Sequence, residues 1–337
     1  MIVRYPLDHD GLWDWNAMDA ERPAAGPVRL TVGVVGTGRV GAILGAALAG
    51  AGHHVVAASG VSDTSRTRAE ALLPGVPLLP PQDVLGEAEL VLLTVPDDVL
   101  PGLVNGLVGT GSVRPSQLLV HTSGRYGVAV LAPAARAGAL PLALHPVMTF
   151  TGTSLDLGRL SGCPFGVTTP NQPETLRPVA EALVLEMGGE PVWVPEESRP
   201  LYHAALAHGS NHLVTLVAQT LDLLSAAGVA EPARLVGPLL AASLDNVLRA
   251  GDAALTGPVA RGDAGTVAQH VRAVGDVAPE ILATYRALAR ATADRALAGH
   301  RLQPEVAEAL LVALAGPVDP PLDPPGSASP GPQDPAR

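Results

Sequence analysis

The stretch that decides the fold reads Val32-Gly33-Val34-Val35-Gly36-Thr37-Gly38-Arg39-Val40-Gly41 and leads into an apolar run that ends at Ala51. An apolar strand, then G-x-G-x-x-G, then a helix is typical of a turn that binds the diphosphate of a dinucleotide. Gly36 permits the tight turn, Gly38 lets backbone amides approach the diphosphate, and Gly41 lets helix and strand pack closely. The helix N-terminus adds partial positive charge. The alternative is a glycine-rich packing turn that binds no ligand.

Short apolar runs alternate with helical patterns on either side of this turn, and runs rich in Val and Leu on both faces favour a parallel sheet covered by helices. The strands are expected at 32–35, 54–58, 90–95, 118–121, 140–145, 165–168 and 192–194. The fold class is therefore α/β, a doubly wound Rossmann-type parallel sheet followed by an all-α domain.

From Ser198 onward only helices are expected, at 201–227, 233–250, 264–274, 277–298 and 304–315. The first of these is apolar nearly all round, which is expected of a helix inside a domain core. We divide the chain into a flexible arm (1–28), a dinucleotide-binding domain (29–196), a helical substrate and dimerisation domain (197–316), and a disordered proline-rich tail (317–337).

The end of the second strand indicates which dinucleotide binds. An NAD site usually places a carboxylate there, about 20 residues beyond the glycines, to accept from the ribose 2′-hydroxyl. Here the strand runs into Ser59, with Arg66 and Arg68 close behind, and the nearest acid, Asp63, falls beyond the strand end. Guanidinium groups suit a 2′-phosphate, so NADP is predicted over NAD. The alternative is that both arginines are solvated charges on a helix face.

Composition excludes several classes of function. All 21 Lys and Arg residues are arginine, so a mechanism that needs a lysine is excluded. The net charge of −11 argues against binding to nucleic acid or to an anionic membrane. A single cysteine, Cys163, and no N-terminal leader pattern favour a cytoplasmic protein. His208 and His212 have a metal-binding spacing but no third ligand, so no metal is predicted.

Several segments together resemble a known family. They are Thr94-Val95-Pro96-Asp97-Asp98, His121-Thr122-Ser123-Gly124, His145-Pro146-Val147-Met148-Thr149-Phe150, Tyr202-His203 through Ser210-Asn211, and residues 255–263. The family pairs a Rossmann-like domain with a helical domain of unknown function, and is related to the 6-phosphogluconate dehydrogenase superfamily. Pyrroline-5-carboxylate reductase, ketopantoate reductase and the β-hydroxyacid dehydrogenases are better-known relatives. The resemblance covers residues 30–315 and implies the fold and cofactor rather than the substrate.

One departure from these relatives affects the chemistry. β-Hydroxyacid dehydrogenases carry a catalytic Lys four residues before an Asn on the first long helix of the second domain. Counting back from Asn211 gives Ala207. If the protein reduces a carbonyl or an imine, the proton for that reaction must therefore come from His, Tyr, Ser or water.

Ligands of an open α/β sheet bind beyond the carboxyl ends of its strands. The candidate catalytic residues are His145, Asn211, His203, Ser123 and His121, and the candidate cofactor contacts are Gly36, Thr37, Gly38, Arg39, Val40, Gly41, Ser59, Arg66, Val95 and Pro96. Each histidine has the alternative of a structural residue bonded to a backbone carbonyl. Asp97 and Asp98 are expected to cap the next helix.

Two functions stay open. The first is an NADP-dependent oxidoreductase that transfers a hydride to or from a small oxo acid or cyclic imine, with a substrate that carries a carboxylate as one option. The second is a non-catalytic NADP(H)-binding sensor or scaffold, which the missing lysine favours. A weaker third involves a deazaflavin partner. The apolar helical domain suggests a homodimer.

Overall fold

The computed structural model describes residues 29–172 and 174–315, and the chain divides into two compact units that meet between Ala207 and His208. This point lies inside helix α9 (Arg199–Ala226) rather than at the expected boundary after residue 196. The expected arm (1–28) and tail (317–337) lie outside the described residues. Within the described part of the chain, no helix is long and apolar enough to cross a membrane.

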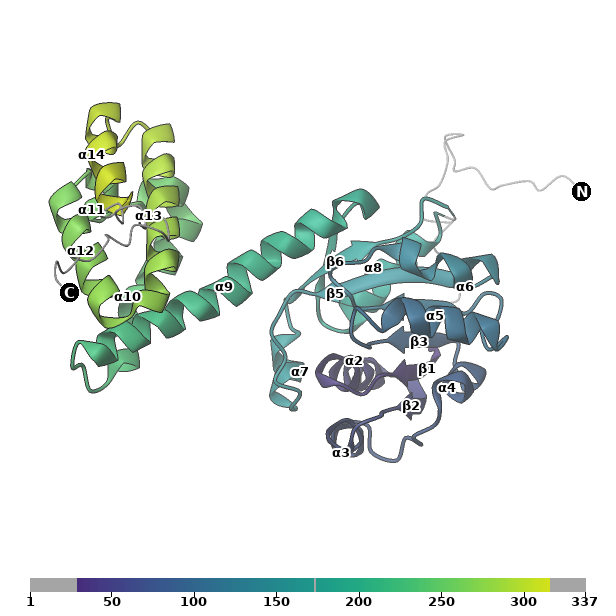
Figure 1. The fold of residues 1–337 in the computed structure, drawn as a ribbon. Coiled ribbons are helices and arrows are strands. Elements are labelled where there is room, and N and C mark those ends of the chain that lie inside the picture. The colour runs from purple at the N-terminus through teal and green to yellow at the C-terminus, as the bar shows by residue number, and fades with distance from the viewer. Residues whose placement is uncertain (1–28, 173, 316–337) are drawn as a thin grey trace, which may run out of the picture. The chain divides into compact units, whose positions relative to one another are not determined.

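The first unit is built on one seven-stranded sheet in the order β2-β1-β3-β4-β5-β6-β7 (Figure 1). The strands are β1 Thr31–Val35, β2 His54–Ser59, β3 Leu90–Leu93, β4 Leu118–His121, β5 Leu140–Pro146, β6 Pro164–Thr168 and β7 Glu190–Trp193. Every expected strand is confirmed, with ends that move by two residues at most. The chain reverses its direction of winding between β2 and β3, so a crevice is expected at the carboxyl ends of β1 and β3.

One part of the expectation is wrong: the sheet is not parallel throughout, because β6 runs antiparallel to β5. The physical reason is the connection between them. It contains only the five-residue helix α7 (Leu155–Arg159), which at about 1.5 Å per residue is too short to carry the chain back along the sheet. β6 therefore starts at the edge where β5 ends, and β7 then pairs with β6 in parallel.

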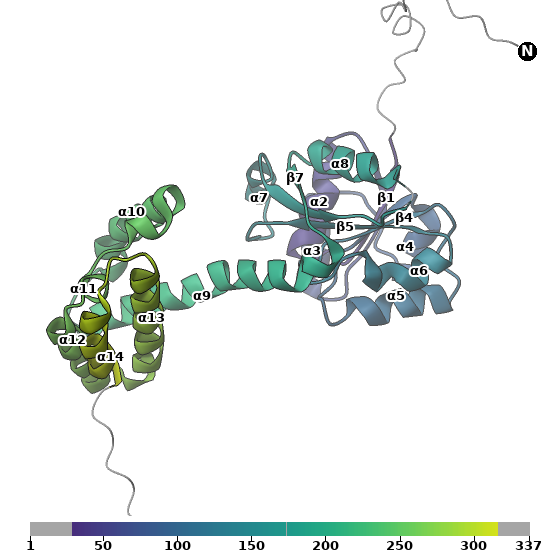
Figure 2. The same ribbon diagram turned by 90° about the horizontal axis from the view of Figure 1, so that it is seen from above.

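Helices cover both faces of the sheet (Figure 2). They are α2 Arg39–Gly50, α3 Asp63–Leu72, α4 Pro81–Glu87, α5 Leu100–Gly109, α6 Ala132–Arg136 and α8 Leu176–Glu186, with one-turn 3₁₀ helices η1 Val128–Leu131 and η2 Glu196–Ser198. One buried cluster joins α2 and α8 to the sheet, and a second joins α4, α5 and α6 to it. Side chains on both faces of the central strands are buried, as expected from their apolar sequence.

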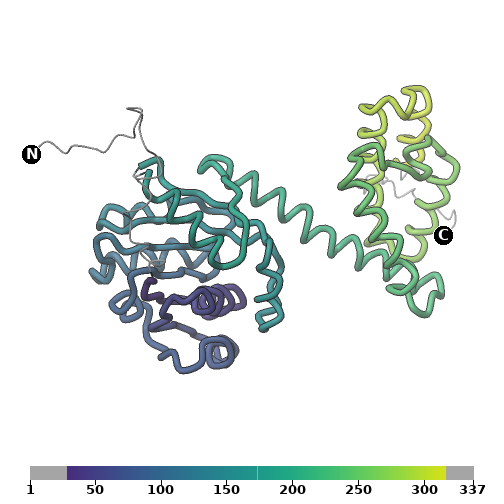
Figure 3. The backbone as a smooth tube through the Cα atoms, turned by 180° about the vertical axis from the view of Figure 1, so that it is seen from behind, coloured from purple at the N-terminus to yellow at the C-terminus, as the bar shows by residue number. Residues whose placement is uncertain are grey.

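The second unit contains only helices (Figure 3). After α9 come α10 Pro232–Ala250, η3 Gly251–Ala254, α11 Pro258–Arg261, α12 Ala264–Val277, α13 Pro279–Ala298 and α14 Pro304–Ala315. The expectation that the first long helix is a core helix is wrong, because Arg199 is the only buried residue of α9. Several of its large apolar side chains are exposed, among them Leu201, Leu213 and Val214.

Candidate dinucleotide and proton-transfer site

The turn between β1 and α2 has the geometry that its glycines predict. Gly36 has a φ of +101°, and a Cβ there would lie 2.8 Å from the carbonyl oxygen of Thr94. A Cβ at Gly41 would collide with the Gly36 carbonyl and the Thr94 hydroxyl. Gly38 differs, because a Cβ there would meet no atom within 4 Å. Gly36 and Gly41 are thus required by the protein's own packing, whereas Gly38 faces open space.

Backbone amides at this turn divide into two groups. The amides of Gly36 and Thr37 both donate to the Ser59 carbonyl at 2.9 Å, which ties the turn to the end of β2. The Gly38 side of the turn begins α2, whose first turn has no side-chain cap and no acidic residue. The first amides of a helix lack intrahelical partners. Those of residues 39–41 are therefore the donors that an anion would meet here.

Thr37 is fully buried, and its hydroxyl donates to the Ser65 carbonyl at 2.9 Å. Both of its polar hydrogens are thus used inside the protein, joining the first turn to α3. A Cβ at Gly60 would collide with this hydroxyl, which explains the glycine after β2. Thr37 remains a candidate cofactor contact from the sequence, and the geometry gives it a positioning role.

Arginines gather near the end of β2. Arg66 Nε donates to the Gly60 carbonyl at 3.3 Å and its side chain is exposed. Arg68 Nε donates to the Gly152 carbonyl at 3.2 Å, and a Cβ at Gly152 would lie 3.0 Å from Arg39 Cγ. Ser59 ends the strand, and Asp63 begins α3 beyond it, as expected. The end of β2 thus carries a hydroxyl and guanidinium groups and no carboxylate.

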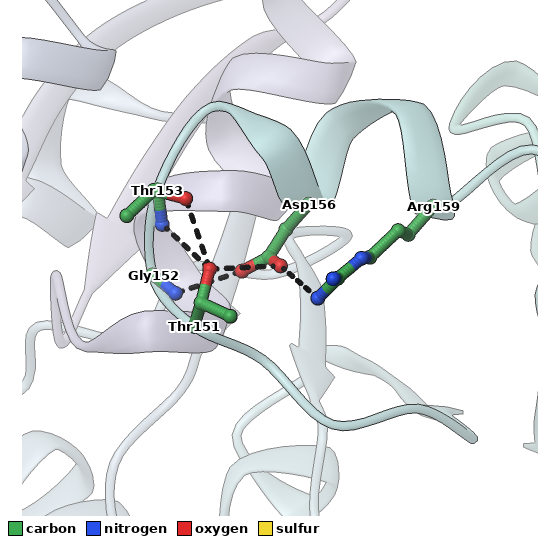
Figure 4. Close-up of polar contacts among 5 residues, drawn as sticks. All are labelled: Thr151, Gly152, Thr153, Asp156 and Arg159. Carbon is green, nitrogen blue, oxygen red and sulfur yellow. Dashed lines mark hydrogen bonds and ion pairs between the residues drawn. The ribbon is translucent and has the colours of Figure 1, made fainter. Parts of the chain in front are cut away.

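Figure 4 shows how the loop beside these arginines is held. Asp156 of α7 is fully buried; its carboxylate accepts from the Gly152 amide at 2.7 Å and from the Thr151 hydroxyl at 3.0 Å, while Arg159 lies 3.4 Å away. Burial raises the pKa of Asp156, but these hydrogen bonds lower it to below its ordinary value. The sequence analysis did not identify this residue, although a run of Thr and Gly just before an Asp is a usable signal.

A second polar cluster lies where β5 ends and α9 begins. His145 Nδ1 is 2.8 Å from the hydroxyl of Tyr202, and the His145 and His203 rings lie edge to face with centroids 6.4 Å apart. A Cβ at Gly124 would lie 2.9 Å from His145 Nε2 and 2.9 Å from His203 Cδ2. A side chain at Gly166 would collide with the Tyr202 hydroxyl. Two glycines therefore leave space for three rings.

Arg199 lies beneath this cluster and is 1% exposed. Its guanidinium donates to the Thr168 hydroxyl at 2.8 Å and to the carbonyls of Gly166, Ala143 and Ser123 at 2.9, 3.3 and 3.5 Å. All four acceptors are neutral, and none of the ion pairs between described residues includes Arg199. The buried guanidinium therefore has no carboxylate in contact with it, and its positive charge lowers the pKa of the neighbouring histidines His145 and His121.

This environment fixes the protonation of His145. Burial, then the charge of Arg199, then His203 lower the pKa of His145 to about 4, so its ring is neutral near pH 7. Burial raises the pKa of Tyr202, so its hydroxyl keeps its proton. When that hydroxyl donates to Nδ1, the ring proton of His145 lies on Nε2, on the side of Gly124.

Two other candidates have their polar atoms engaged inside the protein. His121 is fully buried; Nε2 donates to the Gly127 carbonyl at 2.8 Å, and Nδ1 accepts from the Ser123 amide at 3.2 Å. Burial lowers the pKa of His121 to about 4. The geometry thus favours the structural alternative for His121 over a proton donor. Ser123 Oγ accepts from the amides of Arg125 and Tyr126, both at 3.2 Å.

The other candidates are placed as follows. Val95 and Pro96 lie beyond the end of β3, half-buried and exposed respectively. Asp97 and Asp98 do not cap α5, since its N-cap is Val99 with no side-chain hydrogen bond, and that expectation is wrong. Asn211 lies in the second unit with an exposed side chain, and its role stays a prediction.

The roles of Arg199 and Tyr202 were not predicted. At the start of α9 only His203 was a candidate catalytic residue, whereas Arg199 and Tyr202 lie three residues apart on another face of the helix. Glu196 was not predicted either; its carboxylate accepts from the amides of Val128 and Ala129 at 2.7 and 3.1 Å. That contact holds the chain just before α9 against η1.

Two family models match the chain: a Rossmann-like domain over residues 18–146, and a domain of unknown function, DUF2520, over residues 163–292. A Bacteroides fragilis protein provisionally named an NADP oxidoreductase has a TM-score of 0.66 at 20% identity, over 79% of this chain and 98% of its own. A Thermotoga maritima protein has a TM-score of 0.57 at 21% identity, over 80% and 100%. A Myxococcus stipitatus imine reductase variant, solved with NAD+, has a TM-score of 0.53 at 17% identity, over 86% and 100%.

No curated protein matches the sequence. The two family models confirm the resemblance inferred from the motifs, and the structural likenesses confirm the fold class. At these identities they are evidence of fold alone.

Proposed function

Because the chain joins a Rossmann-like domain to a DUF2520 domain, we propose that it is an NADP-dependent oxidoreductase that acts on a small oxo acid or cyclic imine. The observation that carries this proposal is the contact between His145 and Tyr202 near the carboxyl end of β5, in the same unit as the glycine turn: the two side chains are 2.8 Å apart, and the pKa of His145 is lowered to about 4. A neutral ring with its proton on Nε2 is proposed as the proton donor. The turn supports dinucleotide binding, and the ring supports protonation of a carbonyl or imine.

The glycine turn fits the diphosphate because Gly38 faces open space and the first turn of α2 offers its amides. Arg66, with Arg39 and Arg68 nearby, suits a ribose 2′-phosphate, and the end of β2 has no carboxylate that would prefer a 2′-hydroxyl. These features support NADP over NAD. When bound, the nicotinamide supplies or accepts the hydride.

The protein's part in a reduction is to hold and move a proton. His145 Nε2–H donates its proton to the substrate oxygen or nitrogen as that atom gains charge. The Tyr202 hydroxyl proton moves to His145 Nδ1, so the imidazole stays neutral and tyrosinate remains. Arg199, whose guanidinium carbon is 5.5 Å from the Tyr202 ring centre, stabilises that negative charge. The proton on Nδ1 then returns to the Tyr202 oxygen, and solvent supplies a proton to Nε2, which restores the starting state. No lysine takes part.

The second candidate function is a non-catalytic NADP(H) sensor, which the absence of lysine from the whole chain favours. A screen separates the two functions. The purified protein is incubated with NADPH and, one at a time, 2-oxo acids, 3-oxo acids and Δ1-pyrrolines, and the NADPH absorbance is followed. Turnover that is lost in His145→Gln supports the oxidoreductase. NADPH binding with no turnover across the panel supports the sensor.

We also propose that the chain forms a homodimer through α10. Val236 is the only buried residue of this 19-residue helix, and Leu235, Leu239 and Leu248 are 60%, 64% and 77% exposed. Exposed apolar side chains in such a group mark an interaction surface. Light scattering should give twice the chain mass. A double variant Leu239→Glu/Leu248→Glu should give a folded monomer, and a monomeric wild type contradicts the proposal.

A further inference from the structure

The second unit contains a cavity of about 380 Å³ that lies apart from the residues considered above. Its walls come from α9, from the residues around α11, and from α12 and α13. Among its apolar lining residues are Leu216, Leu223, Val259, Ile281, Leu288 and Ala289. Ligand pockets of proteins typically have volumes of about 300–1,000 Å³, so the cavity has room for a small molecule.

Side chains from two parts of the unit's core line the cavity. One buried cluster joins α11, α12, α13 and α14, and includes Val259 and Ala289. The other consists of residues near the junction of α12 and α13, including Ile281, with Leu223 packed against it. All four of these side chains line the cavity. Apolar surface from both clusters is therefore left without a packing partner at this place, and a ligand would supply one.

Polar groups converge on the same space. His270 Nδ1 is 2.9 Å from the Tyr285 hydroxyl, and the Gln219 amide donates to the Thr284 hydroxyl at 3.3 Å. Burial raises the pKa of Tyr285, so its hydroxyl stays protonated. If Tyr285 donates to His270, its oxygen still accepts a hydrogen bond, as does the Gln219 carbonyl oxygen.

Among the described residues that line the cavity there is no Asp, Glu or Arg. An ionised ligand would therefore lose its hydration without meeting a side chain of permanent charge, which is strongly unfavourable, and His270, the one imidazole in the lining, already bonds to Tyr285. The Tyr285 oxygen and the Gln219 carbonyl oxygen are two open acceptors. These positions favour a neutral ligand with a hydroxyl group.

We propose that the helical unit binds a small uncharged alcohol or phenol with an apolar ring, whose hydroxyl group hydrogen-bonds to Tyr285. No lining residue is among the candidate residues of the proposed oxidoreductase site, and every lining residue belongs to the second unit.

The test is calorimetric titration of the full chain with 2-naphthol and, separately, with 2-naphthoate, which has the same rings and a carboxylate. We expect saturable binding of one 2-naphthol per chain and at least tenfold weaker binding of 2-naphthoate. Tyr285→Phe keeps the ring and should weaken the binding of 2-naphthol about three- to tenfold, which is the usual effect of losing one hydrogen bond. Leu288→Trp, at a half-exposed position of the lining, should block binding with less risk to folding.

Val312→Ala, an exposed change on α14, is the matched control and should change nothing. Circular dichroism establishes that each variant is folded. The proposal is overturned if 2-naphthol fails to bind or if 2-naphthoate binds equally well. It is also overturned if Tyr285→Phe and Leu288→Trp are both folded and both bind 2-naphthol as tightly as the wild type. It is also overturned if Leu288→Trp changes the oligomeric state and leaves binding intact, because the cavity then belongs to an interface. The variant Gly38→Ala, which is expected to lose NADPH binding, should bind 2-naphthol as the wild type does. This result separates the proposed alcohol site from the proposed oxidoreductase activity.

Discussion

The substitution Gly38→Ala separates cofactor binding from folding. A methyl group at Gly38 meets no atom within 4 Å, and the residue has a φ of −67° that alanine adopts readily. The change should therefore leave the apoprotein as stable as the wild type, or more stable by about 0.4–1 kcal/mol, because alanine restricts the unfolded chain. The same methyl group would occupy the space through which a diphosphate approaches the first-turn amides of α2.

The expected loss of binding follows from those amides. A hydrogen bond to a charged group contributes about 1.5–3 kcal/mol, so losing two of them raises the Kd for NADPH roughly 10²- to 10⁴-fold. For the wild type, NADPH at about 100 times its Kd should stabilise the protein by about 2.7 kcal/mol. That corresponds to a rise in Tm of about 5–10 °C for the transition of the first unit, Met1–Ala207, which has the size of a single domain. Gly38→Ala should show almost none of this rise.

Substitutions at two further glycines serve as controls in the same measurement of Tm with and without NADPH. Gly50→Ala, at the far end of α2 where a methyl group also meets nothing, should keep the full NADPH response. Gly41→Ala should lower the Tm of the apoprotein itself, because its Cβ would collide with the Gly36 carbonyl. If NADPH raises the Tm of Gly38→Ala as much as that of the wild type, the diphosphate does not bind at this turn and the reasoning is refuted.

Four other predictions concern single side chains. Arg66→Ser should weaken NADPH binding about tenfold or more and leave NADH unchanged in calorimetry; equal losses for both would remove Arg66 from the 2′-phosphate site. Asp156→Asn should lower the free energy of unfolding by about 1–3 kcal/mol in urea at pH 7. The pKa of Asp156 is lowered in the folded protein. The difference in free energy of unfolding between wild type and variant should therefore be present above pH 3.8 and disappear as the pH falls through the pKa of the folded state. A difference that does not change with pH would contradict this assignment. His121 takes up a proton when the chain is unfolded and stays neutral when it is folded. The free energy of unfolding of the wild type should therefore fall by about 3 kcal/mol between pH 6.5 and about 4. In His121→Gln the free energy of unfolding should fall by less over the same range. Tyr202→Phe should increase the population of His145 protonated on Nδ1, observed by ¹⁵N NMR, and an unchanged ratio would show that Tyr202 does not set the tautomer.

The sequence predicted the sheet well because each strand is a short apolar run and because Gly36 and Gly41 of the first turn each have a local steric reason. The direction of β6 was not predictable in the same way, since it depends on the length of α7, and five residues of helix carry a weak periodic signal. The exposure of α9 was also missed, because an apolar composition does not say how much of a helix has something to pack against.

The proton-transfer cluster was predicted only in part. His145 and His203 stood out as titratable residues near expected strand and helix ends. Tyr202 and Arg199 acquire their roles from contacts with Gly166, Thr168 and the β5 backbone, which are remote in sequence. Burial also decides between the histidines. His121 and His145 both follow strands, and only the hydrogen bonds around them distinguish a fixed ring from one with a proton to give.

Arg199 has a consequence for how the protein responds to acidity. Its guanidinium keeps its charge throughout the physiological range, while the neighbouring imidazoles of His121 and His145 take up protons only in strongly acidic solution. Arg199, His121 and His145 therefore keep the same charges across the acidities that cells experience. A change of one pH unit inside a cell leaves the protonation of these three side chains as it was.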